Sequence, residues 1–237
     1  MEIKCNALVL RAVDYKENDK LLTLLTADRG KLTAVCRGVK KASAKLKFAA
    51  QPFCFAEYVL AERAGRHTVI SAFLHDGFYP LREDIQKFYA ASSVLEVCNL
   101  LQPEGMEGGA LFFHAVQTLG KMCQEPEGGL LVEFLLNALA LAGYPLRLDG
   151  CAKCGNAIKS RGRFSFDTAC FYCDECPSEN CAPVSEVTYR TLRIAAKAEE
   201  GELEADGVKR ALRLLKEYFS QKIECKGESL SEYIRLL

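Results

Sequence analysis

The first third of the chain alternates short apolar runs with turn signals, and it contains no long amphipathic helix pattern. The candidate strands are Cys5–Val13, Lys20–Thr26, Lys31–Arg37, Phe53–Ala61 and His67–Leu74. Hairpin turns are favoured at Asp28-Arg29-Gly30 and at Arg63-Ala64-Gly65-Arg66. Five strands of this size predict a small closed β-barrel such as the OB-fold. The second strand stays ambiguous, because Leu21, Leu22, Leu24 and Leu25 are spaced as well for a helix as for a strand.

From Pro80 onward the hydrophobic period becomes that of a helix. Ile85, Phe88, Tyr89, Ser92 and Leu95 fall on one helical face, which predicts a helix to about Leu101. Further helical stretches are Leu111–Cys123, Leu130–Ala142, Ser185–Glu200 and Gly207–Lys222, with a short tail from Ser229. The stretch 130–142 is apolar almost all round, which is typical of the buried central helix of a bundle. The pattern predicts an α+β multidomain protein with a barrel domain at 1–79 and an α-helical bundle domain at 80–237.

Composition adds the profile of an ordinary globular protein, with 237 residues, 49% of them hydrophobic and 26% charged. The formal net charge is zero, but the charges are unevenly distributed. Residues 1–79 hold 13 Lys/Arg and 8 Asp/Glu, hence +5, and residues 80–237 hold the remaining 18 and 23, hence −5. The longest apolar segment, 130–142, is shorter than the roughly 18 residues that a membrane span needs, so we expect a cytoplasmic protein without membrane contact.

Two Cys-x-x-Cys pairs are the most specific chemical signal in the sequence. Cys151 with Cys154 and Cys173 with Cys176 are separated by 18 residues, a spacing typical of zinc ribbons. Each pair can present two thiolates from a tight turn, and four thiolates provide the tetrahedral soft-ligand set that zinc prefers. The alternating segment 163–166 suits a strand of the hairpin between them. We therefore expect one structural Zn²⁺ per chain, bound in a four-cysteine zinc ribbon inserted at 148–182.

Other cysteines leave an alternative open. Cys170 could pair with Cys173 instead, and Cys181 is a further thiol nearby. Cys5, Cys36, Cys54, Cys98, Cys123 and Cys225 sit within apolar runs and are expected to be small core residues. In a reducing compartment, these thiols are not expected to form structural disulfides.

A basic stretch follows the third predicted strand, with Arg37, Lys40, Lys41, Lys45 and Lys47 and no acidic residue among them. Such a segment can follow a phosphate backbone and bind it in a salt-dependent way. The predicted DNA-binding set is Lys31, Arg37, Lys40, Lys41, Lys45, Lys47, Arg63 and Arg66. The nearby aromatic residues Phe48, Phe53, Phe55 and Tyr58 suit base stacking, but inward-facing core positions are the favoured interpretation for the Phe53/Phe55 alternation.

Catalytic signatures are missing from the sequence. A nucleobase deaminase needs a His or Cys ligand two residues before a Glu, followed by Pro-Cys-x-x-Cys. The only histidines are His67, His75 and His114, none of them in that context, and neither cysteine pair follows a proline. There is no Gly-x-x-x-x-Gly-Lys phosphate loop, and no nucleophile has a credible histidine partner. The sequence predicts a protein that is not an enzyme.

Several short motifs occur together in an order that resembles the RecO family of bacterial recombination mediators. They are Ala7-Leu-Val-Leu-Arg11, the run 19–26, Gly30-Lys-Leu-Thr-Ala-Val35 leading to Arg37-Gly38, Gln51-Pro52, Ala142-Gly-Tyr-Pro145 with Leu148, and the four-cysteine segment. The resemblance covers essentially the whole chain. It implies that 20–26 is a strand. It also maps a Phe-Ser step onto Phe164-Ser165 and the second ligand pair onto Cys173 and Cys176, leaving Cys170 in the turn.

The same resemblance implies a function. The barrel would bind single- and double-stranded DNA, with Arg37 and Lys41 in the region that does so. The protein would anneal strands coated with single-stranded-DNA-binding protein, and with RecR it would help to load RecA at the nucleoid. A docking pocket for the tail of the coating protein is implied in the helical domain. This chain departs from the pattern in its neutral charge and in its extra thiols Cys170 and Cys181.

Two other interpretations compete with this one. A zinc-dependent nucleic-acid-modifying enzyme would show three protein ligands and an exchangeable water. A protein–protein interaction scaffold without DNA binding would leave the loop charges incidental.

Overall fold

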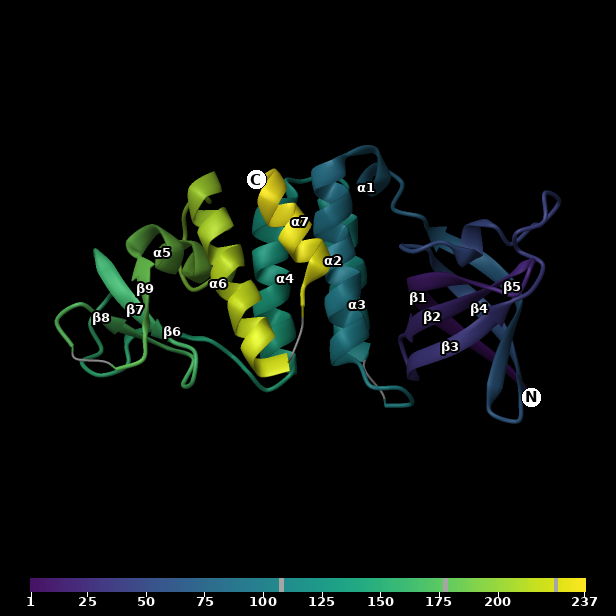
Figure 1. Ribbon diagram of the computed structural model, residues 1–237, viewed down its shortest axis with the longest axis horizontal. Coiled ribbons are helices and arrows are strands. Elements are labelled where there is room, and N and C mark those ends of the chain that lie inside the picture. The colour runs from purple at the N-terminus through teal and green to yellow at the C-terminus, as the bar shows by residue number, and fades with distance from the viewer. Residues whose placement is uncertain (107–108, 177–178, 224–225) are drawn as a thin grey trace. The chain divides into compact units, whose positions relative to one another are not determined.

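The computed structural model describes residues 1–106, 109–176, 179–223 and 226–237 (Figure 1). The predicted core residue Cys225 lies outside these ranges. The chain divides into two compact units, Met1–Gln124 and Glu125–Leu237. Each unit contains buried apolar side chains of its own.

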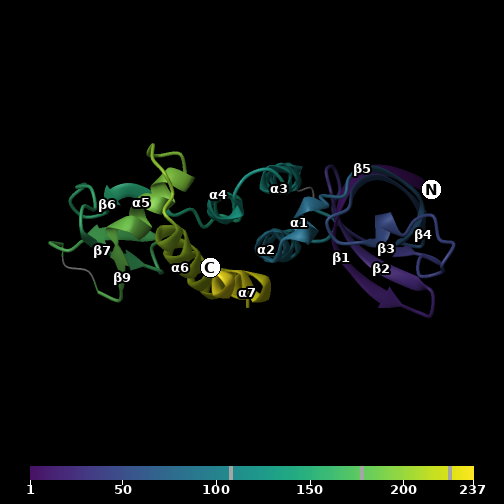
Figure 2. The same cartoon turned by 90° about the horizontal axis from the view of Figure 1, so that it is seen from above.

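The first unit contains a closed five-stranded barrel, which Figure 2 shows as a ring of strands. Its strands are β1 (Glu2–Tyr15), β2 (Asp19–Thr26), β3 (Gly30–Cys36), β4 (Phe55–Arg63) and β5 (Arg66–Asp76). The strand order is β1-β2-β3-β5-β4, and a short parallel pairing of β3 with β5 closes the ring. The predicted OB-like barrel is confirmed, and the ambiguous leucine run is the strand β2.

One long strand explains how five strands close. The first half of β1 pairs with β4 from Glu2 to Leu8, and its second half pairs with β2 from Ala7 to Tyr15. A bulge between Val9 and Arg11 lies in the β2-paired half. Bulges bend a strand and increase its twist, which allows β1 to serve two neighbours.

The barrel interior is filled by alternate residues of each strand, among them the buried Val9, Leu22, Leu24 and Leu60. Tyr58 is also fully buried, and its hydroxyl donates to the carbonyl of Ala49 over 2.7 Å.

Two phenylalanines before and at the start of β4 differ in their surroundings. Phe53 is buried, so the core interpretation is confirmed for this residue. Phe55 is half-buried, and its ring contacts those of His75 and Phe112.

Helices complete the first unit: the 3-10 turn η1 (Phe48–Ala50), α1 (Pro80–Glu83), α2 (Ile85–Leu101) and α3 (Gly109–Met122). The Asp84 side chain caps α2 by accepting from the amides of Gln86 and Lys87. The change from strand to helix lies between Asp76 and Pro80, at the predicted point. The assignment of 1–79 and 80–237 as separate domains stays a prediction.

The second unit combines four helices with a small sheet. The helices are α4 (Glu127–Leu141), α5 (Glu186–Ala195), α6 (Ala205–Ile223) and α7 (Glu228–Leu236), and the strands are β6 (Arg147–Cys151), β7 (Arg161–Ser165), β8 (Cys170–Cys173) and β9 (Ala182–Ser185). The sheet order is β6-β8-β7-β9. Helix α5 ends before the predicted Glu200, because the chain leaves the helical region at Lys197, which has a φ of 58°.

Among the described residues, no helix combines the length and the hydropathy needed to cross a membrane.

Candidate metal centre and nucleic-acid interface

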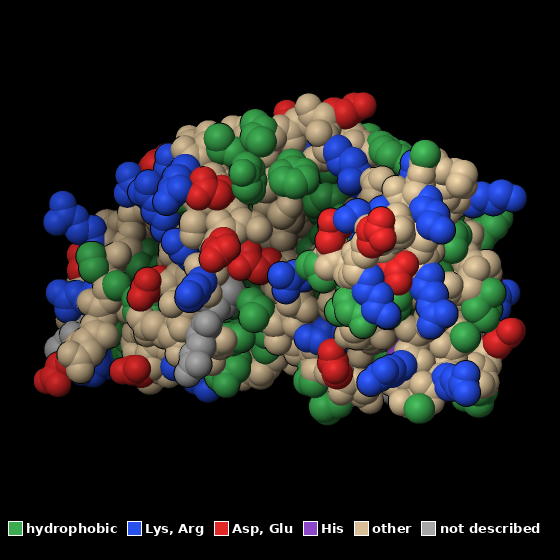
Figure 3. Space-filling view, turned by 45° about the vertical axis from the view of Figure 1, so that its right-hand side comes forward, with side chains coloured by type: hydrophobic (Ala, Val, Ile, Leu, Met, Phe, Trp, Pro, Cys, Tyr) green, Lys and Arg blue, Asp and Glu red, His purple; other side chains and the backbone are tan. Residues whose placement is uncertain are grey.

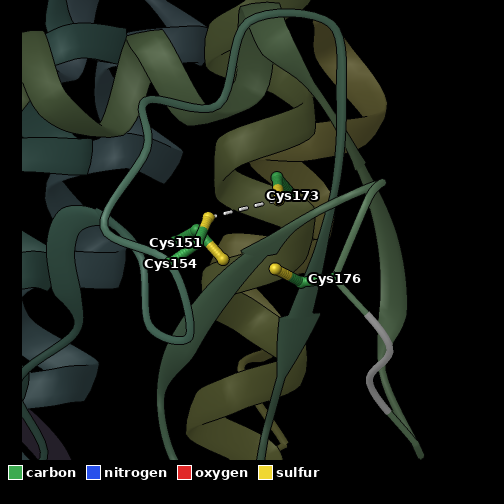
Figure 4. Close-up of side chains that lie close together, drawn as sticks. All are labelled: Cys151, Cys154, Cys173 and Cys176. Atoms are coloured by element: carbon green, nitrogen blue, oxygen red, sulfur yellow. Dashed lines mark hydrogen bonds between the residues drawn. The ribbon is translucent and has the colours of Figure 1, made fainter.

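Four cysteine side chains meet at one end of the small sheet. The Sγ atoms of Cys151, Cys154, Cys173 and Cys176 all lie within 4.8 Å of one another (Figure 4). Cys151 ends β6 and Cys173 ends β8, and each strand runs directly into the turn that carries its second cysteine. The two Cys-x-x-Cys pairs are thus brought together from segments that are distant in the sequence.

Backbone hydrogen bonds fix the first of these turns. The amide of Gly155 donates to the carbonyl of Cys151 over 2.8 Å, and the amide of Cys151 donates to the carbonyl of Asn156 over 2.8 Å. Gly155 has a φ of +76°, a left-handed conformation that glycine adopts without strain. In the second turn, the amide of Cys176 donates to the carbonyl of Cys173 over 3.3 Å. Both turns therefore hold their two sulfur atoms on the same side.

The spacing of the sulfur atoms fits a tetrahedral metal. A Zn–S bond of about 2.3 Å implies sulfur–sulfur separations of roughly 3.8 Å around a tetrahedron. The Sγ atoms of Cys154 and Cys173 are 3.7 Å apart. The cluster can therefore hold a metal ion with four thiolate ligands, a set that leaves no position for a reactive water.

Two thiols of the cluster have pKa values that are shifted in opposite directions. Burial raises the pKa of the Cys151 thiol, but amide hydrogen bonds from Cys173, Cys154 and Lys153 outweigh it and bring the pKa to about 6. The hydrogen bond with Cys173, together with burial and the other sulfur atoms, raises the pKa of Cys176 to about 12. A bound cation would have to displace the remaining thiol protons, so metal affinity would rise with pH.

The two additional thiols lie outside this cluster. Cys170 begins β8 and is buried, and its Sγ donates to the carbonyl of Thr168 over 3.3 Å. Cys181 donates to the carbonyl of Glu179 over 3.2 Å. Among the described residues, the group that could hold a metal consists of the four predicted cysteines.

A second site is a basic pocket of about 620 Å³ at one end of the barrel. This is the end at which β1, β3 and β4 finish and β2 and β5 begin. The pocket is lined by Tyr15, Lys16, Asp19, Val35, Arg37, Arg63, Ala64, Arg66, His67 and Thr68. The parallel pairing of Val35 with Thr68 brings the end of β3 beside the β4–β5 hairpin. Four cationic side chains and one carboxylate thus share one concave surface.

The carboxylate of the pocket is already engaged. The Oδ1 atom of Asp19 accepts a hydrogen bond from the amide of Gly38 over 2.8 Å. Among the described residues, Lys16, Arg37, Arg63 and Arg66 make no ion pair. The four cations outnumber the one carboxylate of the pocket, so an anion bound here would meet net positive charge.

The structure separates the eight predicted DNA-binding residues into groups. Arg37, Arg63 and Arg66 line the pocket, and Lys41 and Lys45 are both exposed in the β3–η1 loop. The remaining three have partners: Lys31 Nζ donates to Asn99 O over 2.6 Å, Lys40 pairs with Asp14 at 2.6 Å, and Lys47 donates to Ala42 O over 2.9 Å. The hydrogen bond from Lys40 lowers the pKa of the Asp14 carboxyl. Figure 3 shows Lys and Arg side chains over the barrel with Asp and Glu interspersed.

Sequence reasoning missed several residues of the pocket, among them Tyr15, Lys16 and His67. Lys16 lies in the β1–β2 turn and has a φ of 55°, while Tyr15 is 41% exposed. The sequence does show a lysine, Lys16, in a turn between two predicted strands. Only the closed barrel shows that this turn lies at the same end as Arg37.

Comparisons with known proteins extend over both units. Residues 1–78 match the family model described as Recombination protein O N terminal, and residues 82–230 match Recombination protein O C terminal. Relatives named DNA repair protein RecO include one from Clostridium perfringens, 30% identical over 193 residues, which are 81% of this chain and 78% of the relative. The one from Pelotomaculum thermopropionicum is 33% identical over 191 residues, which are 81% of this chain and 74% of the relative. The one from Myxococcus xanthus is 34% identical over 173 residues, which are 72% of this chain and 71% of the relative.

Proposed function

The chain belongs to the RecO family of DNA repair proteins, and on that premise we propose that it is a non-enzymatic recombination mediator whose barrel binds single- and double-stranded DNA. The observation that carries the proposal is the basic pocket at the end of the barrel, where Arg37, Arg63 and Arg66 come together. Unpaired cations on a concave surface bind a polyanion by releasing its counterions. Tyr15 at the same pocket offers an exposed ring for an unpaired base.

Family membership supports the biological role that we propose. In this proposal the protein anneals complementary strands coated with single-stranded-DNA-binding protein, and with RecR it helps to load RecA. It would work at the nucleoid, where these substrates occur. Lys41 and Lys45, in the loop after β3, would extend the contact with DNA beyond the pocket.

The metal in this proposal is one structural Zn²⁺ per chain, held by Cys151, Cys154, Cys173 and Cys176. Zinc in such a site contributes folding free energy to a segment that has little core of its own. Because all four ligands come from the protein, the site supports no hydrolysis, which argues against the zinc-dependent enzyme as an alternative.

The proposal is tested by titrating labelled single-stranded DNA with the full chain at several salt concentrations, with anisotropy as the readout. The triple variant Arg37→Glu, Arg63→Glu, Arg66→Glu is expected to bind more weakly. The slope of log K against log salt should fall by about 2, because each lost contact with a single strand removes roughly 0.7.

A matched control reverses the charge of three other cations in the same unit: Lys4→Glu, Arg11→Glu and Arg29→Glu. This variant has the same net charge, and its salt slope should stay within about 0.5 of the unchanged protein. An equal loss in both triple variants would show that net charge, rather than the pocket, governs binding. No DNA binding by the unchanged protein at low salt would favour the interaction scaffold.

A further inference from the structure

The small sheet of the second unit has two chemically different faces. On the inner face, the buried Phe164 and Phe171 pack with their ring centroids 4.7 Å apart. Phe164 also contacts Tyr218 of α6 at 5.7 Å, and Phe171 contacts Tyr189 of α5 at 4.9 Å. This aromatic cluster fixes the sheet against the helices, so its opposite face is held in a defined orientation within the unit.

The outer face carries exposed arginines. In β7, the residues alternate between exposed Arg161 and Arg163 and buried Gly162 and Phe164. Arg163 pairs across the ladder with Tyr172 of β8, and side chains directly opposite in a ladder lie on the same face. Tyr172 is half-buried and makes no ring contact among the described residues. Two guanidinium groups and a phenol ring therefore lie next to one another on this face.

Charge accumulates on the same segment. Between residues 147 and 163 the basic residues are Arg147, Lys153, Lys159, Arg161 and Arg163, and the single acidic residue is Asp149. All five basic side chains are exposed, and none forms an ion pair within the described ranges. On the helices of the same unit, by contrast, Arg190, Arg193, Arg210 and Arg235 are each paired with a carboxylate. The charges of segment 147–163 are thus available to an external anion.

We infer that the outer face of this sheet, defined by Arg161, Arg163 and Tyr172, is a second nucleic-acid-binding surface that takes a single strand. Arg161 and Arg163 are two residues apart on one strand, which places them about 7 Å apart, comparable with the spacing of successive phosphates along a nucleic-acid strand. Tyr172 beside them provides a surface for base stacking. An acidic protein segment would use the two charges but would have no need of the ring.

Two DNA sites would let a single chain hold two strands at once. This inference rests on the proposed function, because the barrel pocket supplies the first DNA site. Holding two strands raises the effective concentration of one strand near the other, which is the physical requirement for annealing.

The test is a bridging measurement on the full, metal-loaded chain. Two non-complementary oligo-dT strands, one with a donor dye and one with an acceptor dye, are mixed with substoichiometric protein. Energy transfer appears only when one protein particle holds both strands. Analytical ultracentrifugation of the protein with one unlabelled strand tests whether each particle holds a single chain under these conditions, so that bridging by a dimer is not counted.

In the ribbon variant Arg161→Glu, Arg163→Glu, Tyr172→Ala, the Kd for the first strand is expected to stay within about twofold, while the Kd for the second rises at least about tenfold. The conservative variant Arg161→Lys, Arg163→Lys keeps both positive charges and should keep the energy transfer. This result would show that the ribbon variant loses energy transfer through its changed charge. A control with the same charge change, Arg213→Glu with Arg235→Glu, alters exposed arginines of α6 and α7 and should also keep it.

Full energy transfer in the ribbon variant would overturn this inference and leave the barrel proposal intact. Loss of energy transfer in the Arg213/Arg235 control as well would also overturn it, since net charge would then be the cause. Failure of the unchanged chain to bind either strand would overturn both proposals. If the triple variant Arg37→Glu, Arg63→Glu, Arg66→Glu loses the first strand and the ribbon variant keeps it, the result supports the division of roles between the two units.

Discussion

Gly30 stands at the turn between β2 and β3, where the fold accepts no side chain. Its φ is +64°, and a Cβ built there would lie 1.7 Å from the carbonyl oxygen of Met106. Gly30→Ala is therefore expected to destabilise the protein by about 2–5 kcal/mol, combining left-handed strain with a steric clash against backbone. The midpoint of urea unfolding followed by circular dichroism measures this.

Gly65 provides the control for that change. It has a φ of +71° in the β4–β5 hairpin, but a Cβ there would meet no atom within 4 Å. Gly65→Ala should therefore cost only the strain, about 1–2 kcal/mol. Equal losses in the two variants would mean that the contact with Met106 does not constrain Gly30.

The cysteines make a second test at the same scale. Cys151→Ser and Cys176→Ser are each expected to lower metal content and folded yield, because each removes one of four converging thiolates. Cys170→Ser should lower neither, since its sulfur lies outside the cluster and donates to Thr168 O. Metal analysis of the three purified variants measures this. Metal loss in Cys151→Ser and Cys170→Ser but not in Cys176→Ser would mean that Cys170, rather than Cys176, is the fourth ligand.

Sequence spacing was a good guide to the four-cysteine cluster and a poor one to the basic pocket of the barrel. A Cys-x-x-Cys pair is a local turn, so its two ligands can be recognised from adjacent residues. The basic pocket gathers side chains from three separate segments, and only the closed barrel brings Lys16 and His67 beside Arg37. A charge run along the chain also says nothing of local partners, such as Asp14 for Lys40 or Asn99 for Lys31.

At the scale of the element, the cap of α2 is a local feature with a measurable effect. Asp84 accepts hydrogen bonds from Gln86 N at 2.8 Å and Lys87 N at 3.0 Å. Asp84→Ala is expected to destabilise the protein by about 1 kcal/mol, because two amides at the helix start lose their partner. The neighbouring exposed Glu83→Ala should change stability by less than about 0.5 kcal/mol. Chemical denaturation of both variants compares them, and equal effects would contradict the capping role.

Elements with a strong period of hydrophobic positions were the most predictable from the sequence. The apolar segment 130–142 corresponds to α4, and the predicted helix end near Leu101 agrees with the end of α2. The leucines of β2 could not be assigned from periodicity, because what makes them a strand is pairing with β1 and β3 on either side. Helix ends were harder still: the chain leaves α5 at Lys197, a position with no glycine or proline to signal it.

At the scale of the whole molecule, the neutral net charge conceals its distribution. The excess of +5 in residues 1–79 is offset by −5 in the rest of the chain. Within the second part, however, the segment 147–163 is basic while the acidic residues Asp167, Asp174, Glu175 and Glu179 follow it. Polyanion binding depends on local potential, so a neutral chain can present a basic surface in each of its two units.

Metal removal should affect the two units differently, because all four cysteines of the cluster lie in the second unit. After chelation, amide hydrogen exchange is expected to accelerate in the sheet β6–β9, which carries the four thiolates at one end, and to stay unchanged in β1–β5. DNA affinity at the barrel should remain within about twofold, while bridging of two strands should be lost because the ribbon no longer holds its arginines in place. Exchange mass spectrometry and the energy-transfer assay, each with and without chelator, measure both effects. Restoring Zn²⁺ should reverse them, and an equal acceleration of exchange throughout the barrel would show instead that the metal stabilises the chain as a whole.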